Sequence, residues 1–157
     1  MEFPYETDLE GETRPLVGAR FYRNGLSIPN PPAIIPCLVD TGSVRTFLQW
    51  ELGTAYGVWP ETQAYGRSVQ IGGMSRQARE TIMSVEIPDP QGGQSIVLER
   101  VQVLFVKGKL PVPGLLGASV LNGLVAVFRD REGFLNIREA GDFARDECPH
   151  YNGAYPL

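Results

Sequence analysis

The chain is built from short stretches of alternating apolar and polar residues, which glycine and proline interrupt at frequent intervals. Residues 16–21 and 26–28 flank Asn24-Gly25, a pair that tolerates the positive φ of a type I′ turn, and this pattern predicts two strands joined by a hairpin turn. The 18 glycines and 13 prolines are spread along 157 residues, as is typical of many short strands and tight turns. The pattern therefore predicts an all-β fold.

The later part of the chain continues this alternation. Residues 66–87 alternate around Gly72-Gly73 and predict a long hairpin, and residues 95–106 predict another strand. Residues 125–128 and 134–137 are apolar segments on either side of a polar turn that contains glycine, which predicts a closing hairpin. Strands are thus expected over most of the chain.

Three segments depart from the alternating pattern. Residues 33–39 are nearly all apolar, as expected of a buried strand, and this strand ends abruptly at Asp40. Residues 47–56 and 118–124 carry apolar residues at helical spacing and predict two short helices. A carboxylate is therefore expected to emerge from the core directly after a buried strand.

The charged and metal-binding residues exclude several classes of function. The formal net charge is −4, with 14 basic and 18 acidic residues and no run of Lys or Arg, which argues against a surface that binds nucleic acid. One histidine, His150, and two cysteines, Cys37 and Cys148, are too few for a zinc site or for catalysis by a histidine-based triad. The two cysteines could pair, but Cys37 lies in an apolar run, where a buried thiol is more frequent.

The absence of long apolar stretches bears on the location of the protein. No window approaches about 18 consecutive apolar residues, and the N-terminus has no basic region followed by an apolar one. The sequence therefore predicts a soluble cytoplasmic protein that has no membrane span. With so few histidines and cysteines, it also predicts that no metal or other cofactor is required.

The chain divides into three parts on composition. Residues 1–15 contain five acidic residues within the first twelve positions and predict a solvated arm. Residues 16–138 carry the strand pattern and predict a single domain. Residues 139–157 are polar and irregular and predict a C-terminal tail.

The residues around Asp40 resemble the catalytic strand and loop of aspartic proteases. The resemblance is carried by Ile35-Pro36-Cys37-Leu38-Val39-Asp40-Thr41-Gly42-Ser43. In the retropepsin-like members a flap hairpin follows this loop, and later two apolar residues and a glycine lead into a short helix. Residues 66–78 and Gly114-Leu115-Leu116-Gly117 occur here in that order. The resemblance covers about residues 16–137 and implies a closed β-barrel with a flap hairpin and one or two short helices.

The single Asp-Thr-Gly motif implies a homodimer. Pepsin-like enzymes carry two such motifs in one chain, so the resemblance implies that Asp40 of two copies meet across a two-fold axis. Two carboxylates about 3 Å apart cannot both ionise, so one takes a proton from a water molecule while the other hydrogen-bonds the developing oxyanion. The implied activity is hydrolysis of a peptide or protein substrate without a metal or a covalent intermediate.

The resemblance also implies roles for the neighbours of Asp40 and for the flap. Thr41 is expected to hydrogen-bond across the dimer, Gly42 to let the substrate backbone approach, and the Ser43 hydroxyl to donate to the carboxylate. The tip of the flap is expected to open and close over the substrate. The flap residues expected to bind substrate are Gln70, Ile71, Gly72, Gly73 and Met74.

The chain departs from the retroviral members at one pair of positions. These members usually carry an arginine directly after the glycine of the later element, where this chain has Ala118-Ser119. The acidic residue with which that arginine pairs is replaced by Val44. Because both partners of the ion pair are absent together, the departure is consistent with a folded dimer.

Three other interpretations stay open. A retropepsin-like module that dimerises or binds peptides without cleaving them would keep the fold, since fold alone does not establish activity. A small-ligand β-barrel would account for the strands and turns, although no cluster of polar residues defines its pocket. Asp40 could also simply cap a turn at the end of a strand. An active-site replacement at Asp40 separates the protease from the inactive module.

Overall fold

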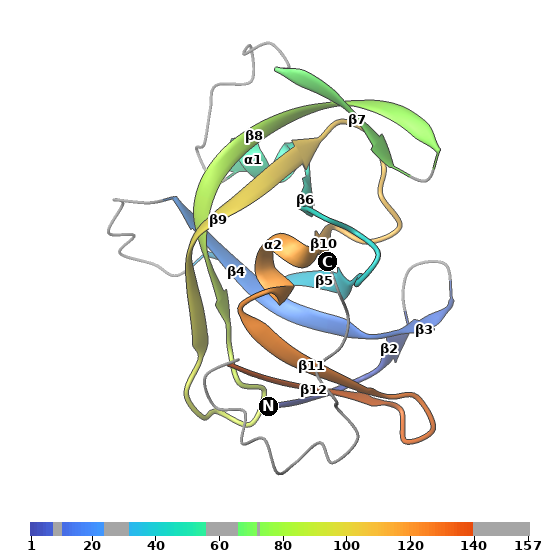
Figure 1. The fold of residues 1–157 in the computed structure, drawn as a ribbon, viewed down its shortest axis with the longest axis vertical. Coiled ribbons are helices and arrows are strands. Elements are labelled where there is room, and N and C mark those ends of the chain that lie inside the picture. The colour runs from blue at the N-terminus through green and yellow to red at the C-terminus, as the bar shows by residue number, and fades with distance from the viewer. Residues whose placement is uncertain (8–10, 24–31, 56–65, 72, 140–157) are drawn as a thin grey trace, which may run out of the picture.

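The computed structural model describes residues 1–7, 11–23, 32–55, 66–71 and 73–139. Most of these residues form strands, and two short helices lie between them (Figure 1). In chain order the elements are β1 (Glu2–Pro4), β2 (Glu6–Thr7), β3 (Thr13–Arg14), β4 (Leu16–Arg23), β5 (Ile35–Val39), β6 (Thr46–Gln49), α1 (Trp50–Ala55), β7 (Arg67–Ile71), β8 (Met74–Ile87), β9 (Ile96–Val106), β10 (Gly114–Leu116), α2 (Ala118–Leu121), β11 (Leu124–Arg129) and β12 (Phe134–Glu139).

Six strands close into a barrel. The largest sheet has the order β4-β5-β10-β6-β9-β8-β7, and an additional pairing of β4 with β8 joins its two sides into a ring. β7 lies outside the ring as the hairpin partner of β8. Closing the sheet in this way leaves few unpaired strand edges. The prediction of an all-β closed barrel is confirmed.

The barrel interior is filled from alternate positions of its strands. In β4, Val17, Ala19 and Phe21 have no exposed surface, and Val85 and Ile87 are equally buried in β8. Alternate residues of a strand point to opposite faces, so this spacing directs one face of each strand inward. The alternation in the sequence therefore predicts which side chains form the core.

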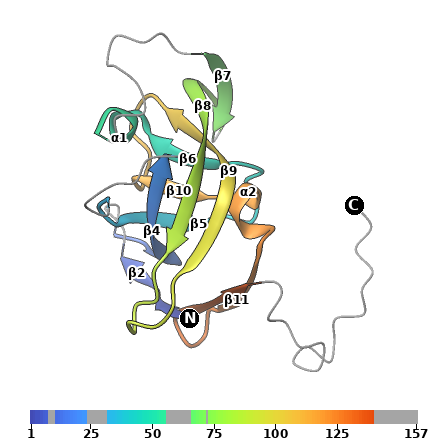
Figure 2. The same cartoon turned by 90° about the vertical axis from the view of Figure 1, so that its left-hand side faces the viewer.

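β8 belongs both to the barrel and to the hairpin that extends from it. From Ala78 onward it pairs with β9, and its last residues also pair with β4, while residues 74–77 pair with β7. The β7–β8 hairpin lies at the end of the molecule opposite the N-terminus (Figure 2). This is the hairpin predicted over residues 66–87, and Gly73 adopts a φ of +76° in its turn. Gly72 lies outside the described residues.

The first predicted helix begins later than the sequence pattern indicates. Residues 47–49 belong to β6, and α1 starts only at Trp50. β6 lies between β10 and β9, and Thr46, Phe47 and Leu48 are all buried. A central strand that is buried on both faces reads as a continuous apolar run, which periodicity cannot distinguish from a helix.

The N-terminal segment differs from the predicted solvated arm. β1 pairs with β12 in a three-stranded sheet of order β1-β12-β11, and Phe3 is only 6% exposed. Its neighbours in β1, Glu2 and Pro4, are both exposed, so one buried aromatic side chain anchors an otherwise exposed strand. The strand predicted over residues 26–28 and the tail from residue 140 onward lie outside the described residues.

The last predicted elements form with small shifts. The closing hairpin is β11 and β12, and the second helix, α2, ends at Leu121, before β11 begins at Leu124. The two apolar residues between Gly114 and Gly117 belong to β10, which pairs in parallel with β5 and antiparallel with β6. In the part of the chain that the structure describes, no helix is long and apolar enough to cross a bilayer.

Candidate active site

Asp40 stands at the carboxyl end of β5, where the chain leaves the barrel. Val39 is buried and Asp40 is half-buried, so the carboxylate emerges from the core as predicted. The backbone N–H of Asp40 donates to the Leu116 carbonyl at 3.1 Å. The backbone N–H of Gly42 donates to Asp40 Oδ1 at 2.9 Å, and that of Ser43 donates to the Asp40 carbonyl at 3.3 Å. A tight turn therefore holds one oxygen of the carboxylate and fixes its direction.

The glycines on either side of Leu115-Leu116 are required by close packing. A Cβ at Gly117 would lie 2.2 Å from the Arg45 carbonyl oxygen and 2.7 Å from that of Ser43. A Cβ at Gly114 would lie 2.4 Å from Cys37 Sγ. Gly117 lets the start of α2 come directly against the catalytic loop, and Gly114 lets β10 pack closely on β5.

Hydrogen bonds from the start of α2 fix the other side of the loop. The backbone N–H of Ala118 donates to the Ser43 carbonyl at 2.8 Å, and that of Ser119 donates to the Val44 carbonyl at 3.2 Å. Ser119 Oγ accepts from the backbone N–H of Thr46 at 3.0 Å and lies 2.9 Å from Thr46 Oγ1. Thr46, which is fully buried, also accepts from the backbone N–H of Gly117 at 3.2 Å.

These contacts lie next to Val44 and Ala118, the positions at which the resemblance implies an ion pair. Ser119 and Thr46 link the loop to α2 through neutral hydrogen bonds, which need no buried charge. The sequence identified the loss of the ion pair but not its substitute. The available signal was Thr46, a polar residue at the start of an apolar run.

The structure corrects the role predicted for Ser43. Its hydroxyl donates to the Arg45 carbonyl at 2.8 Å and not to the Asp40 carboxylate. The turn that brings the Gly42 N–H to Asp40 directs the Ser43 side chain toward the following residues. Thr41 is exposed, and its side chain finds no hydrogen-bond partner among the described residues of this single chain.

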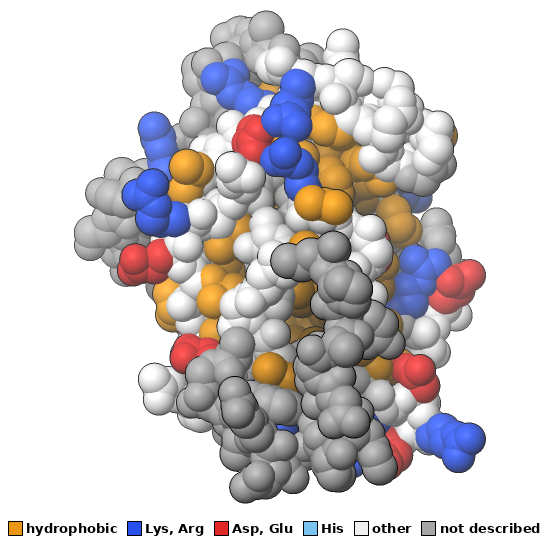
Figure 3. Space-filling view, viewed as in Figure 1, with side chains coloured by type: hydrophobic (Ala, Val, Ile, Leu, Met, Phe, Trp, Pro, Cys, Tyr) orange, Lys and Arg blue, Asp and Glu red, His pale blue; other side chains and the backbone are white. Residues whose placement is uncertain are grey.

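A cavity of about 510 Å³ opens beside Asp40. Its walls come from the catalytic loop, from the first strand of the hairpin and from an apolar floor. The lining residues are Asp40, Gly42, Ser43, Val44, Arg45, Arg67, Ser68, Val69, Gln70, Ile71, Phe47, Leu104 and Leu115. Among these described residues Asp40 carries the only carboxylate. On the face drawn in Figure 3, hydrophobic side chains gather beside basic ones in its upper half.

The predicted flap residues divide into two groups. Gln70 and Ile71 line the cavity with Asp40, so the structure brings them to the predicted site. Gly73 and Met74 lie at the hairpin turn and do not line the cavity, and Met74 is 56% exposed. Val69 and Ile71 pack on the small apolar cluster that contains Phe47 and Leu104, which connects the hairpin to the floor.

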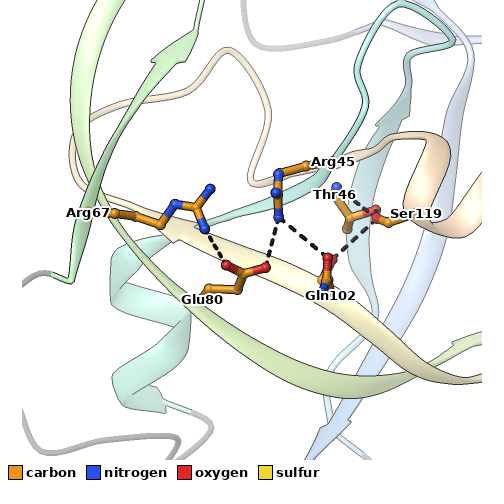
Figure 4. A network of polar contacts seen from close by, with 6 residues as sticks. All are labelled: Arg45, Thr46, Arg67, Glu80, Gln102 and Ser119. Atoms are coloured by element: carbon orange, nitrogen blue, oxygen red, sulfur yellow. Dashed lines mark hydrogen bonds and ion pairs between the residues drawn. The ribbon is translucent and has the colours of Figure 1, made fainter.

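Two charged side chains that sequence analysis did not single out, Arg45 and Arg67, line the cavity, and both contact a third, Glu80 (Figure 4). Arg45 Nη1 donates to Glu80 Oε1 at 2.8 Å, and Arg67 Nη1 donates to Glu80 Oε2. Arg45 Nη1 also lies 3.4 Å from Gln102 Oε1. The three residues come from different parts of the chain, so no local sequence pattern could show that they form one cluster.

The described residues offer little that resembles a metal site. No three side chains of His, Cys, Asp or Glu lie close enough together in this part of the chain to hold a metal ion. Cys37 is buried and forms no disulfide with another described residue, and burial raises the pKa of its thiol. Cys148 lies outside the described residues, so a disulfide between the two cysteines stays untested.

Comparisons with known proteins agree with this arrangement. The family model described as aspartyl protease matches residues 31–120, more than half of the chain. The crystal structure of a retropepsin-like aspartic protease from Rickettsia conorii is similar at 19% identity and a TM-score of 0.56, covering 88% of this chain and 98% of that chain. The EIAV protease is similar at 17% identity and a TM-score of 0.43, covering 71% of this chain and 88% of that chain. No curated protein sequence matches significantly. The predicted retropepsin-like fold is confirmed, and the chain belongs to the aspartyl protease family.

Proposed function

We propose that this protein is an aspartic endopeptidase that acts as a homodimer, with Asp40 of each copy supplying one carboxylate of the catalytic dyad. The observation that carries the proposal is the position of Asp40. Its carboxylate is fixed in a tight turn and lines a cavity that β7 of the β7–β8 hairpin also lines. The family and the fold support protease activity in general. The dimer follows from the chemistry that one carboxylate cannot perform alone.

The reaction divides between two carboxylates. The ionised member accepts a proton from a bound water molecule, whose oxygen attacks the carbonyl carbon of the scissile peptide bond. The protonated member donates a hydrogen bond to the oxygen on which negative charge develops. Proton transfer to the nitrogen of the leaving amine then breaks the C–N bond. The Gly42 N–H keeps Asp40 Oδ1 in place, so Oδ2 is the oxygen free to face the water molecule.

A second copy is the simplest source of the second carboxylate. Among the described residues that line the cavity of one chain, Asp40 carries the single carboxylate, and a two-fold axis beside it would place Asp40 of the second copy opposite. Like charges about 3 Å apart share a single proton, which supplies the base and the acid at once. The exposed Thr41 side chain would then be available for a hydrogen bond across the axis.

The hairpin supplies the part of the site that admits substrate. Gln70 and Ile71 line the cavity from β7 and would contact an extended peptide along its backbone and side chains. Gly73, with its positive φ, lies in the turn and would permit the tip, including Gly72 and Met74, to fold over the peptide. Closure would exclude bulk water from the dyad.

Peptide cleavage by wild type and Asp40→Asn tests the proposal. A peptide library would be incubated across about pH 3.5 to 7 at several protein concentrations, because a dyad titrates as a pair and requires two chains. We expect Asp40→Asn to lower cleavage by about 10²–10⁴-fold, the range for loss of general acid–base catalysis. Activity per chain of the wild type should rise with concentration until the dimer is saturated.

The controls separate the protease from the inactive module. Circular dichroism and sedimentation equilibrium on Asp40→Asn establish that the variant is folded and show whether it forms the same dimer. Cleavage that survives in Asp40→Asn would assign the activity to another group or to a contaminant. A wild-type dimer that cleaves no peptide would support a module that binds or dimerises without catalysis.

A further inference from the structure

The wall of the cavity next to the catalytic loop carries positive charge. Arg45 and Arg67 both line the cavity, whereas Glu80, which contacts both guanidinium groups, does not. A molecule that enters the cavity therefore meets the two cations before the carboxylate behind them. We call Arg45, Arg67 and Glu80 the basic wall (Figure 4).

The basic wall has one positive charge more than its internal ion pairs neutralise. Two guanidinium groups share the two oxygens of a single carboxylate, and Gln102, the further partner of Arg45, is neutral. Among the described residues, the side-chain hydrogen bonds of both arginines use only Nη1. Each guanidinium has five N–H donors, so most donors on each arginine stay available for another acceptor.

The exposure of the three side chains fits a site that a ligand can reach. The arginine side chains are 34% exposed for Arg45 and 42% for Arg67, whereas Glu80 is 26% exposed. Partial burial weakens screening by solvent, yet the free faces of both guanidinium groups remain accessible. Arg45 follows the catalytic loop and Arg67 begins the hairpin strand, so the wall joins both parts of the site.

We infer that the basic wall recognises an Asp or Glu side chain of the substrate peptide, close to the bond that is cleaved. This inference rests on the proposed protease function. A carboxylate at this position would bring the charge of the cluster to zero and could accept two parallel N–H bonds from one guanidinium. A Lys or Arg side chain would raise the surplus charge, and a neutral side chain would leave it unchanged.

The homodimer would carry this recognition twice. Each copy of the chain contributes one basic wall, so the two walls would lie on opposite sides of the scissile bond. A peptide runs in one direction through a symmetric cleft, and its acidic residues would therefore be favoured at one position on each side. A preference at two positions is a more specific expectation than a general attraction of acidic peptides.

Matched peptides test the preference. A peptide that the wild type cleaves would be resynthesised with Glu, Gln or Lys at each position near the cleaved bond, and kcat/KM would be measured for every member. At one position on each side we expect Glu to be favoured over Gln by roughly tenfold, the effect of one hydrogen bond to a charged group, and Lys to be least favoured. The preference should weaken as salt is raised, because the groups are partly exposed.

Two variants of the wall should move the preference in opposite directions. Arg45→Gln combined with Arg67→Gln removes both cations and should abolish the preference for Glu. Glu80→Gln removes the competing carboxylate and should increase the preference. A purely structural role of the cluster predicts lower activity on all peptides alike in both variants. As a control, Arg23→Gln removes one positive charge from an exposed position at the end of β4. It should leave the preference for Glu unchanged.

Binding to Asp40→Asn distinguishes failure of this inference from failure of the proposed function. The affinity of fluorescently labelled Glu, Gln and Lys peptides would be measured by anisotropy with this variant, which need not cleave them. Tighter binding of the Glu peptide, lost when Arg45 and Arg67 are also replaced, would support the basic wall even if the wild type cleaved nothing. Equal binding and equal cleavage of Glu and Gln peptides would overturn the inference and leave the protease proposal intact.

Discussion

The catalytic loop and the β7–β8 hairpin face the same cavity but are held in very different ways. The loop donates a backbone hydrogen bond from Asp40 to the Leu116 carbonyl on one side and accepts backbone hydrogen bonds from Ala118 and Ser119 on the other. The hairpin is held mainly by pairing of β7 with β8, and among the described residues β7 has no other strand as a neighbour. Its tip therefore depends on far fewer contacts than the loop.

Under the proposed function, this difference suits the two walls of the site to separate tasks. Proton transfer requires the carboxylate to be positioned within a few tenths of an ångström, which a loop fixed from both sides achieves. Entry of a peptide requires one wall to move, and an edge hairpin can move without breaking the barrel. Replacements on the loop should therefore cost stability, whereas those on the hairpin should cost little.

The largest effect is expected at Gly117, where the loop meets β10 and α2. In Gly117→Ala the new Cβ would overlap the Arg45 carbonyl, which belongs to the backbone and cannot rotate away. We expect the free energy of unfolding to fall by about 3 kcal/mol, measured by urea denaturation.

Gly66→Ala is the matched control on the hairpin side. Gly66 immediately precedes β7, and nothing lies within 4 Å of an added Cβ. We expect a change within about 0.5 kcal/mol. Equal losses in the two variants would contradict the assignment of a fixed loop and a loosely held hairpin.

The next largest effect is expected at Ser119. In Ser119→Ala the backbone N–H of Thr46, a fully buried residue, loses its acceptor. We expect a loss of about 2 kcal/mol, the cost of an unsatisfied buried donor.

A serine pair on the hairpin provides the comparison for Ser119. Ser68 and Ser75 hydrogen-bond through their hydroxyl groups across β7 and β8, where both side chains are exposed to water. Ser68→Ala should change the unfolding free energy by less than about 0.5 kcal/mol because water replaces the lost partner. A loss at Ser68 as large as that at Ser119 would show that the hairpin is as firmly held as the loop.

A smaller effect is expected at the hairpin turn. Gly73 has a φ of +76° and no atom within 4 Å of an added Cβ, so Gly73→Ala introduces backbone strain without a clash. We expect a loss of about 1 kcal/mol in stability, and less for Gly73→Asn, since asparagine adopts this backbone region more readily. Thermal denaturation of both variants tests the order, and a loss from Asn as large as that from Ala would refute the strain explanation.

The smallest effect on stability is expected at the C-terminal end of β8, which pairs with β4 in the barrel. The Tyr22 hydroxyl donates to Glu86 and lowers the pKa of that carboxyl below its ordinary value of 4.5; Ser95 and Arg20 act in the same direction, while burial opposes them. Because the pKa is lower in the folded state, this contribution to stability is present above about pH 4.5 and is lost as the pH falls through the folded pKa.

Unfolding experiments at several pH values measure this contribution. Glu86→Gln cannot ionise, so its stability should fall less steeply below about pH 4.5 than that of the wild type. Glu99→Gln replaces an exposed glutamate on β9 and serves as the control. Parallel curves of stability against pH for the wild type and Glu86→Gln would show that this carboxylate does not stabilise the C-terminal end of β8.

Much of the fold follows from local patterns in the sequence. β4, β8 and β9 are amphipathic strands whose alternation directs one face inward, and the apolar run before Asp40 forms β5. The prediction fails where burial is two-sided or where a single residue acts as an anchor. β6 resembles a helix because three consecutive residues are buried, and one aromatic, Phe3, is enough to bring β1 onto β12.

The site is predictable only in part because its contacts join distant segments. The motif at Asp40 and the hairpin residues Gln70 and Ile71 are evident from local sequence. The hydrogen bonds between Thr46 and Ser119 and the contacts of Glu80 with two arginines depend on how the sheet is arranged, which periodicity does not specify. The hydroxyl of Ser43 shows the same limit at short range, since the turn directs it away from the carboxylate.

The position of β10 has a consequence for the order in which the protein can fold. β10 comes late in the chain, yet it lies between β5 and β6, which come early, and it supplies the carbonyl that holds the Asp40 N–H. During synthesis from the N-terminus, the segment that carries Asp40 must wait until residues 114–119 have emerged before its turn can be completed. Such non-local pairing places folding on the slow, millisecond-to-second scale of barrels with high contact order. A nascent chain of this protein thus acquires its carboxylate geometry only after residues 114–119 have emerged, when all six barrel strands are already available to enclose it.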